Sequence, residues 1–118
     1  MSEMAYIAIP YTDPDKSVIE QRVKILCEID AMLMKLGIFT VSPVLKHLLF
    51  IHAKDLPSDW KYWEEYSYTL LARCQTMYVV TVPGWEESVG VQAEIAFCEK
   101  MDIKIVYLDE YGQCWAQR

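Results

Sequence analysis

Short apolar runs alternate with longer amphipathic stretches along the whole chain. Four of these runs are apolar and short, and each is closed by a proline, a Ser-Pro pair or an acidic residue, which is typical of buried strands. They cover Ala5–Ile9, Ile38–Val41, Met77–Val82 and Ile103–Leu108. The pattern therefore predicts four strands, and a fifth, at the edge of the sheet, is expected over Tyr111–Trp115.

The stretch that follows the first strand has the features of a long helix. Ser17 and Glu20 form an S-x-x-E capping box, in which each side chain bonds a backbone amide at the start of a helix. An apolar-rich stretch then runs from Val18 to Leu36, and Gly37 is placed to end the helix.

Two further helices are expected later in the chain. One covers Trp60 to about Arg73, with Ser58 or Asp59 as its cap, and the other is capped by Ser88 and ends near Met101. The segment between the second strand and the first of these helices is apolar in part, but its two histidines and its proline leave its conformation open.

Strands and helices that alternate in this order predict a parallel sheet with right-handed crossovers. We therefore expect one α/β domain over residues 1–118, a three-layer sandwich with a parallel, flavodoxin/Rossmann-like sheet. Ligands bind beyond the carboxyl ends of such strands, which selects Pro10–Lys16, Ser42–Asp59 and Pro83–Gly90. The first of these connections lacks G-x-G-x-x-G, and no P-loop occurs, so neither a dehydrogenase nor a nucleoside triphosphatase is indicated.

Composition narrows the class of ligand. The 118 residues carry a formal net charge of −6, which argues against binding to a nucleic acid polymer. No apolar stretch approaches the roughly 20 residues of a membrane span, and no signal peptide is visible, so we expect a cytoplasmic protein. The four cysteines are scattered and the two histidines lie five residues apart, so no metal site is predicted.

The third connection carries the candidate chemistry. If Ser88 caps a helix, its hydroxyl and the first backbone amides form an anion site at the positive end of that helix. Glu94 follows Gly90 by one helical turn, so its carboxylate leans over a residue that has no side chain. Such an arrangement would frame a small phosphorylated ligand. The alternatives are a solvent-facing Glu94, a Gly90 that serves close packing, and a Ser88 that only caps the helix.

The chain resembles a known superfamily in this region. Its Ser88-x-Gly90-Val91-x-x-Glu94 is similar to the S-x-G-V-x-x-E motif of deoxynucleoside-5′-monophosphate N-hydrolases, and to the G-x-x-x-E segment of nucleoside 2-deoxyribosyltransferases. An uncharacterised bacterial and phage group of that superfamily is more similar still. The landmarks of that group in this chain are Tyr6-Ile7-Ala8-Ile9-Pro10-Tyr11, Ser42-Pro43, Asp59-Trp60, Leu71-Ala72-Arg73-Cys74 and Pro83-Gly84-Trp85-Glu86-Glu87-Ser88.

The resemblance implies roles for individual residues. Glu94 matches the nucleophile that attacks the anomeric carbon of the sugar, and Tyr6 matches the tyrosine that orients this carboxylate. Ser88 and Gly90 match the elements that hold a 5′-phosphate. At the position of the family's acidic aspartate, however, this chain has Ser67, and a serine is not a comparable acid near neutral pH.

The resemblance thus implies an N-glycosidase or deoxyribosyltransferase that acts on a nucleoside or its 5′-monophosphate and needs no cofactor. A non-catalytic binder of a nucleotide or an ADP-ribose-like signal is the alternative, and a vestigial site is the third reading. Pro10, Tyr11 and Trp85 are further substrate-binding candidates, the two aromatic residues by stacking on a base, whereas Trp60 and Trp63 are assigned to the core or to a subunit interface. The apolar circumference of the first helix predicts a homo-oligomer.

Overall fold

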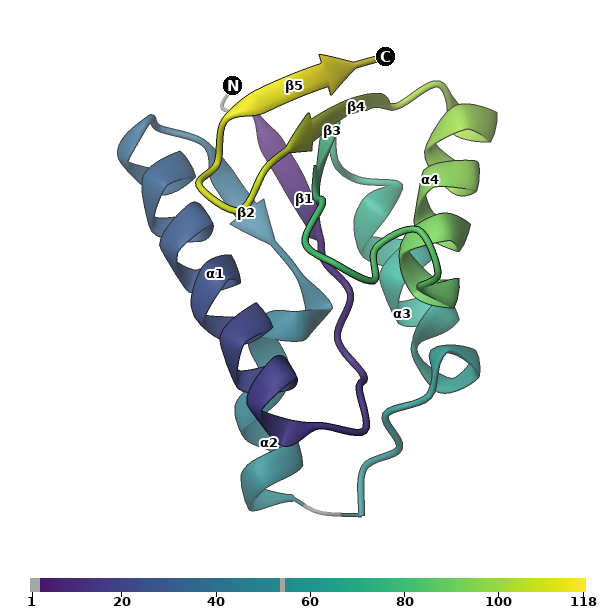
Figure 1. The fold of residues 1–118 in the computed structure, drawn as a ribbon. Coiled ribbons are helices and arrows are strands. Elements are labelled where there is room, and N and C mark those ends of the chain that lie inside the picture. Colours follow the sequence, from purple (N-terminus) through teal and green to yellow (C-terminus); the bar gives the residue numbers. More distant parts are fainter. Residues whose placement is uncertain (1–2, 54) are drawn as a thin grey trace.

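The computed structural model describes residues 3–53 and 55–118, and these form one sheet with helices on both faces (Figure 1). The strands are β1 (Met4–Ala8), β2 (Phe39–Val41), β3 (Thr76–Val80), β4 (Lys104–Leu108) and β5 (Cys114–Gln117). The helices are α1 (Lys16–Lys35), the 3-10 helix η1 (Pro43–Lys46), α2 (His47–His52), α3 (Trp60–Leu71) and α4 (Val89–Met101).

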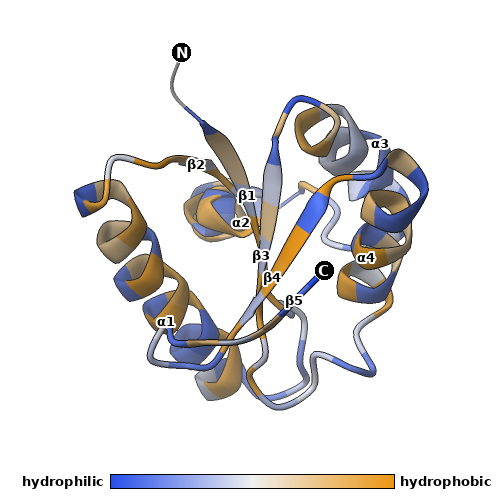
Figure 2. Cartoon of the chain, turned by 90° about the horizontal axis from the view of Figure 1, so that it is seen from above, coloured by the Kyte–Doolittle hydropathy of each residue, from blue (hydrophilic) through white to orange (hydrophobic). Residues whose placement is uncertain are grey.

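The sheet has the order β2-β1-β3-β4-β5. Its first four strands are parallel, and β5 pairs antiparallel with β4 at the edge. Seen from above, α1 lies on one side of the sheet and α3 and α4 lie on the other (Figure 2). The predicted three-layer α/β sandwich with a flavodoxin-like parallel sheet is therefore confirmed, and the predicted edge strand lies slightly later in the chain than expected.

Two hydrophobic clusters bury the faces of the sheet. On one face, Ile7 and Ile9 pack against Leu26, Ile29 and Leu33 of α1. The other face holds Tyr6 and Ala8 of β1, together with residues of α3 and α4. Because successive side chains of a strand point to opposite faces, a strand buried on both sides appears in the sequence as a continuous apolar run.

The helix starts were only partly predicted. Asp15 caps α1, since its Oδ1 accepts hydrogen bonds from the Ser17 amide at 2.9 Å and from the Ser17 hydroxyl at 2.7 Å. The expected Ser17–Glu20 capping box is therefore wrong, because an aspartate two residues earlier takes the capping position. The prediction for Ser88 is confirmed: its Oγ accepts a hydrogen bond from the Val91 amide at 3.2 Å.

The segment whose conformation was left open folds as η1 followed by α2. It carries several exposed apolar side chains, among them Leu48 and Ile51. At the end of α1, Met34 and Leu36 are likewise 62% and 70% exposed, and the homo-oligomer stays a prediction. In the described part of the chain, no helix combines the length and the apolar character that crossing a membrane requires.

Candidate functional site

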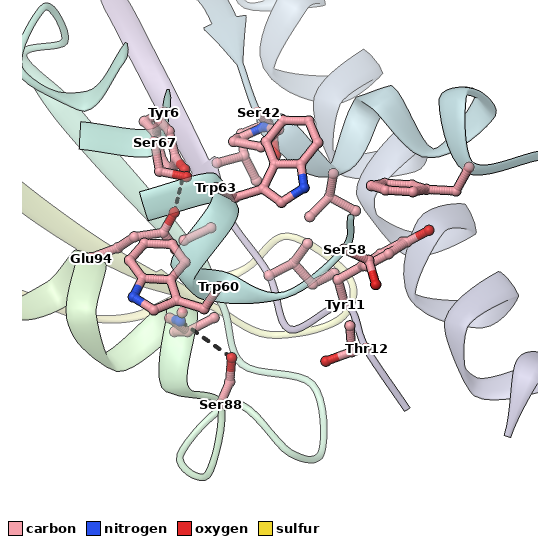
Figure 3. A pocket seen from close by; sticks show the side chains of 18 residues that line it. Tyr6, Tyr11, Thr12, Ser42, Ser58, Trp60, Trp63, Ser67, Ser88 and Glu94 are labelled. Carbon is pink, nitrogen blue, oxygen red and sulfur yellow. Dashed lines mark hydrogen bonds between the residues drawn. The ribbon is translucent and has the colours of Figure 1, made fainter. Parts of the chain in front are cut away.

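A cavity of about 110 Å³ opens beyond the carboxyl ends of β1 and β2 (Figure 3). Four stretches of the chain contribute to its wall: the end of β1 with the loop after it, the segment after β2, α3 with its approach, and the start of α4. The lining residues are Tyr6, Ile7, Ala8, Ile9, Tyr11, Thr12, Ser42, Pro43, Val44, Phe50, Ser58, Trp60, Trp63, Ser67, Ser88, Gly90, Val91 and Glu94.

Glu94 and Tyr6 meet at the inner end of this cavity. Glu94 lies on the face of α4 that also buries Val91, Ile95 and Cys98, and only 6% of it is exposed. The Tyr6 hydroxyl, which is buried on β1, donates a hydrogen bond to Glu94 Oε2. The structure thus excludes a solvent-facing Glu94 and orients its carboxyl group as the resemblance implied.

Burial is the largest cause of the pKa shifts of both Glu94 and Tyr6. It raises the pKa of Glu94 from the ordinary 4.5 to about 8, although the hydrogen bond from Tyr6 pulls that pKa down in part. The pKa of Tyr6 is raised well above its ordinary value, first by burial and then by the charge of Glu94. Among the described residues, no lysine, arginine or histidine lines the cavity to offset the burial of the carboxylate. In the free protein at pH 7, Glu94 is therefore mainly protonated.

Ser67 lies beside the Tyr6–Glu94 pair. It is 1% exposed on α3 and lies next to Tyr6 (Figure 3). Its hydroxyl lowers the pKa of the Tyr6 phenol in part. The position at which the resemblance implied an acidic aspartate thus lines the same cavity, and it offers a hydroxyl instead of an acid.

Ser88 and Gly90 both line the cavity, but their geometry differs from the expectation. The amide of Val91 is already bonded to Ser88 Oγ, so Val89 and Gly90 supply the amides that remain for an anion. A Cβ on Gly90 would lie 3.1 Å from Cε3 of Trp60, so the indole of Trp60 fills the space beside the glycine. The bare side of Gly90 therefore serves close packing between α3 and α4.

Of the other predicted binding residues, Tyr11 lines the cavity, whereas Pro10 and Trp85 do not. Tyr11 lines the cavity, and its hydroxyl shares a 2.7 Å hydrogen bond with His47 Nδ1. Pro10 is buried but does not reach the cavity wall. Trp85 lies elsewhere, because its ring packs against Tyr107 and Trp115 with centroid distances of 5.8 and 6.4 Å. The structure thus gives no place at this cavity for stacking of a base on Trp85.

Sequence reasoning missed the aromatic wall formed by Trp60 and Trp63. Both were assigned to the core or to a subunit interface, and both line the cavity (Figure 3). A signal for their position was present: Trp60, Trp63 and Ser67 are spaced by three and four residues, so they share one face of α3. Because the resemblance placed Ser67 at the site, this spacing predicts that both tryptophans lie at the site as well.

Arg22 holds together the two loops that flank the site. Its Nη1 donates to the carbonyl oxygen of Thr12 at 3.1 Å, and its Nη2 donates to that of Pro83 at 2.9 Å. Gly84 has a φ of +97°, and a Cβ there would lie 2.5 Å from Nη2 of Arg22. The buried guanidinium thereby fixes the loop after β1, which carries Tyr11, against the loop after β3.

Comparison with known proteins gives a family but no activity. A search of curated proteins finds no match to this chain. A family model described as "Domain of unknown function (DUF1937)" matches residues 3–110, which includes all of the lining residues of the cavity. The chain therefore belongs to the DUF1937 family.

Proposed function

We propose that the protein cleaves or transfers at the N-glycosidic bond of a (deoxy)nucleoside or its 5′-monophosphate, with Glu94 as the nucleophile. The observation that carries this proposal is a buried carboxyl group, oriented by Tyr6, at the inner end of a cavity beyond the strand ends. The resemblance of the Ser88–Glu94 segment to nucleoside-processing enzymes supports the same chemistry.

The reaction needs few groups. The Glu94 carboxylate attacks the anomeric carbon of the sugar while the bond to the base breaks and its electron pair leaves with the base nitrogen. A water molecule then attacks the same carbon, releases the Glu94 carboxylate and loses a proton, which balances the proton that the departed base takes up on its nitrogen. This sequence gives hydrolysis, and a second base in place of water gives transfer. The positive charge that develops on the sugar in both transition states is stabilised by the ionised carboxylate.

The raised pKa of Glu94 sets a condition on this reaction. With a pKa of about 8, the carboxyl group must lose its proton before it can attack. The hydrogen bond from Tyr6 favours the ionised form, so Tyr6 both orients the nucleophile and lowers the cost of its ionisation.

The size and the wall of the cavity fit a sugar better than a whole nucleotide. A volume of about 110 Å³ lies below the several hundred Å³ usual for drug-sized ligands. The sugar would occupy the inner end beside Glu94, and the base would lie toward Trp60 and Trp63, whose rings can stack on an aromatic surface. A 5′-phosphate would rely on Ser88 and the first amides of α4.

Ser67 favours a second candidate function. A positioned acid that protonates the leaving base typically contributes about 10²–10⁴-fold to the rate, and the hydroxyl of Ser67 cannot supply that proton. The same cavity could therefore bind a nucleotide or an ADP-ribose-like signal without turning it over.

One assay separates the two candidates. The protein is incubated with the deoxynucleosides and their 5′-monophosphates, and free base is measured by chromatography, with Glu94→Gln as the matched control. Release of base by the natural protein but not by the variant supports the enzyme, whereas retention of intact ligand in equilibrium dialysis without release supports the binder. If neither occurs with these ligands, nor with the ribonucleosides, their 5′-monophosphates and ADP-ribose, both candidates are contradicted and a vestigial site is favoured.

A further inference from the structure

The hydroxyl of Ser42 stands out among the buried polar groups. Ser42 is 7% exposed, and its Oγ is the buried side-chain oxygen for which the structure, over residues 3–53 and 55–118, provides no hydrogen-bond partner. A buried hydroxyl without a partner destabilises a folded protein, so such groups are rare and call for an explanation.

The local structure shows that the fold does not use this hydroxyl. Ser42 is the N-cap residue of η1, where a serine side chain usually accepts a hydrogen bond from an amide of the first turn. Here the side chain makes no such bond, and the backbone carbonyl of Ser42 accepts from the Leu45 amide at 3.1 Å instead. The next residue is Pro43, which has no amide hydrogen to offer.

Ser42 lies in the wall of the cavity. The residue follows the last residue of β2, Val41, which pairs with Tyr6 in the sheet, and it lines the same cavity as Tyr6 and Glu94 (Figure 3). Its neighbours on that wall, Pro43 and Val44, offer no polar side chain. Rotation about χ1 can turn the hydroxyl among three staggered positions without moving the backbone.

We propose that Ser42 is a substrate-binding residue whose hydroxyl exchanges a hydrogen bond with a hydroxyl group of the sugar in the cavity. A serine hydroxyl both donates and accepts, as a sugar hydroxyl does, and the described lining residues include no cation that would favour a charged group at this wall. That the ligand is a sugar rests on the proposed function; that Ser42 binds a ligand rests on its unused hydroxyl.

The variant Ser42→Ala tests the proposal through two measurements. In the ligand-free protein, the urea midpoint of unfolding should stay the same or rise, because the substitution removes a buried oxygen that has no partner. The affinity for the deoxynucleosides and ribonucleosides, measured by calorimetry, should fall about tenfold, the usual effect of one lost hydrogen bond. Ser88→Ala is the matched control for stability: its oxygen accepts from the Val91 amide, so its midpoint should fall.

Each possible outcome either supports or overturns the binding role of Ser42. A lower urea midpoint for Ser42→Ala, or an unchanged affinity, overturns the proposal, because the hydroxyl would then serve the fold or nothing at all. If Ser42→Ala binds nucleosides more weakly but the natural protein releases no base, the binding role of Ser42 is supported and the proposed enzymatic activity is contradicted. If the natural protein and Ser42→Ala release base at equal rates and with equal KM, the binding role of Ser42 is contradicted and the proposed function is not. If the natural protein binds no nucleoside, the binding role of Ser42 and the proposed function are both contradicted.

Discussion

The hydroxyl of Tyr6 on β1 donates a hydrogen bond to the carboxyl group of Glu94 on α4, and so joins the central layer of the protein to an outer one. Both side chains are buried, and both border the cavity. The pair therefore links the stability of the fold to the chemistry of the site, and the consequences can be measured separately.

The first prediction concerns stability against pH. Unfolding lets Glu94 ionise near pH 4.5, whereas the folded protein keeps its proton up to about pH 8. Between these values the unfolded state binds fewer protons, so the free energy of unfolding falls as pH rises, by up to about 5 kcal/mol for such a pKa difference. Glu94→Gln should lose this dependence: it should match the natural protein near pH 4.5 and exceed its urea midpoint at pH 8. Equal midpoints at pH 8 would contradict the raised pKa.

The second prediction concerns the rate against pH. Because the attacking carboxylate must be ionised, kcat/KM for release of base should rise with pH and level off above about 8. Tyr6→Phe removes the hydrogen bond that lowers the pKa of Glu94, so the midpoint of this profile should move to higher pH and the rate at pH 7 should fall. A profile that keeps its midpoint in Tyr6→Phe would assign the ionisation to another group.

The third prediction concerns the missing acid. Ser67→Asp places a carboxyl group at the position where the proposed function would need an acid, and it should speed release of base by up to about 10²–10⁴-fold. Ser67→Asn is the matched control, since it has the same size and no acidic proton. Turnover is compared for both variants after circular dichroism has shown that they are folded. A gain shared by both variants would mean that space, and not acidity, limits the rate.

The fourth prediction concerns Arg22. Its buried guanidinium satisfies carbonyl groups in two loops, so Arg22→Met should lower the free energy of unfolding by about 2–4 kcal/mol and raise KM through the loosened Tyr11 loop. Lys24→Met, on the exposed side of the same helix, should change neither quantity appreciably. If Arg22→Met unfolds no more easily than Lys24→Met, the two loops are held by other contacts.

Much of the fold could be predicted because it follows from short-range patterns. Strands β1, β3 and β4 are buried on both faces and therefore appear as apolar runs, and Ser88 caps a helix as its residue type suggests. The Ser17 cap failed because the helix begins earlier: Asp15 takes the N-cap position and accepts from the Ser17 amide. No pattern predicted η1 and α2, because their apolar side chains partly face outward, and periodicity then carries little information.

The site was predicted less evenly. Glu94 and Tyr6 were placed together by resemblance, but the burial that raises the pKa of Glu94 depends on how α3 and α4 pack, which no local pattern contains. Trp85 packs against other aromatic rings where stacking on a base was expected, and Trp60 lines the cavity where a core or interface position was expected. An aromatic residue suits either environment until its neighbours are known. The sequence placed Ser42 at the start of a ligand-side connection, but it could not show that the hydroxyl lacks a partner, because that depends on the packing around it.

Mass spectrometry can show whether Glu94 attacks the sugar. The protein is mixed with a deoxynucleoside, quenched in acid and digested, and the peptide that contains Glu94 is weighed. We expect a deoxyribosyl ester on Glu94 of the natural protein and none in Glu94→Gln, which should also release no base. Release of base by Glu94→Gln at the natural rate would mean that Glu94 is not the nucleophile.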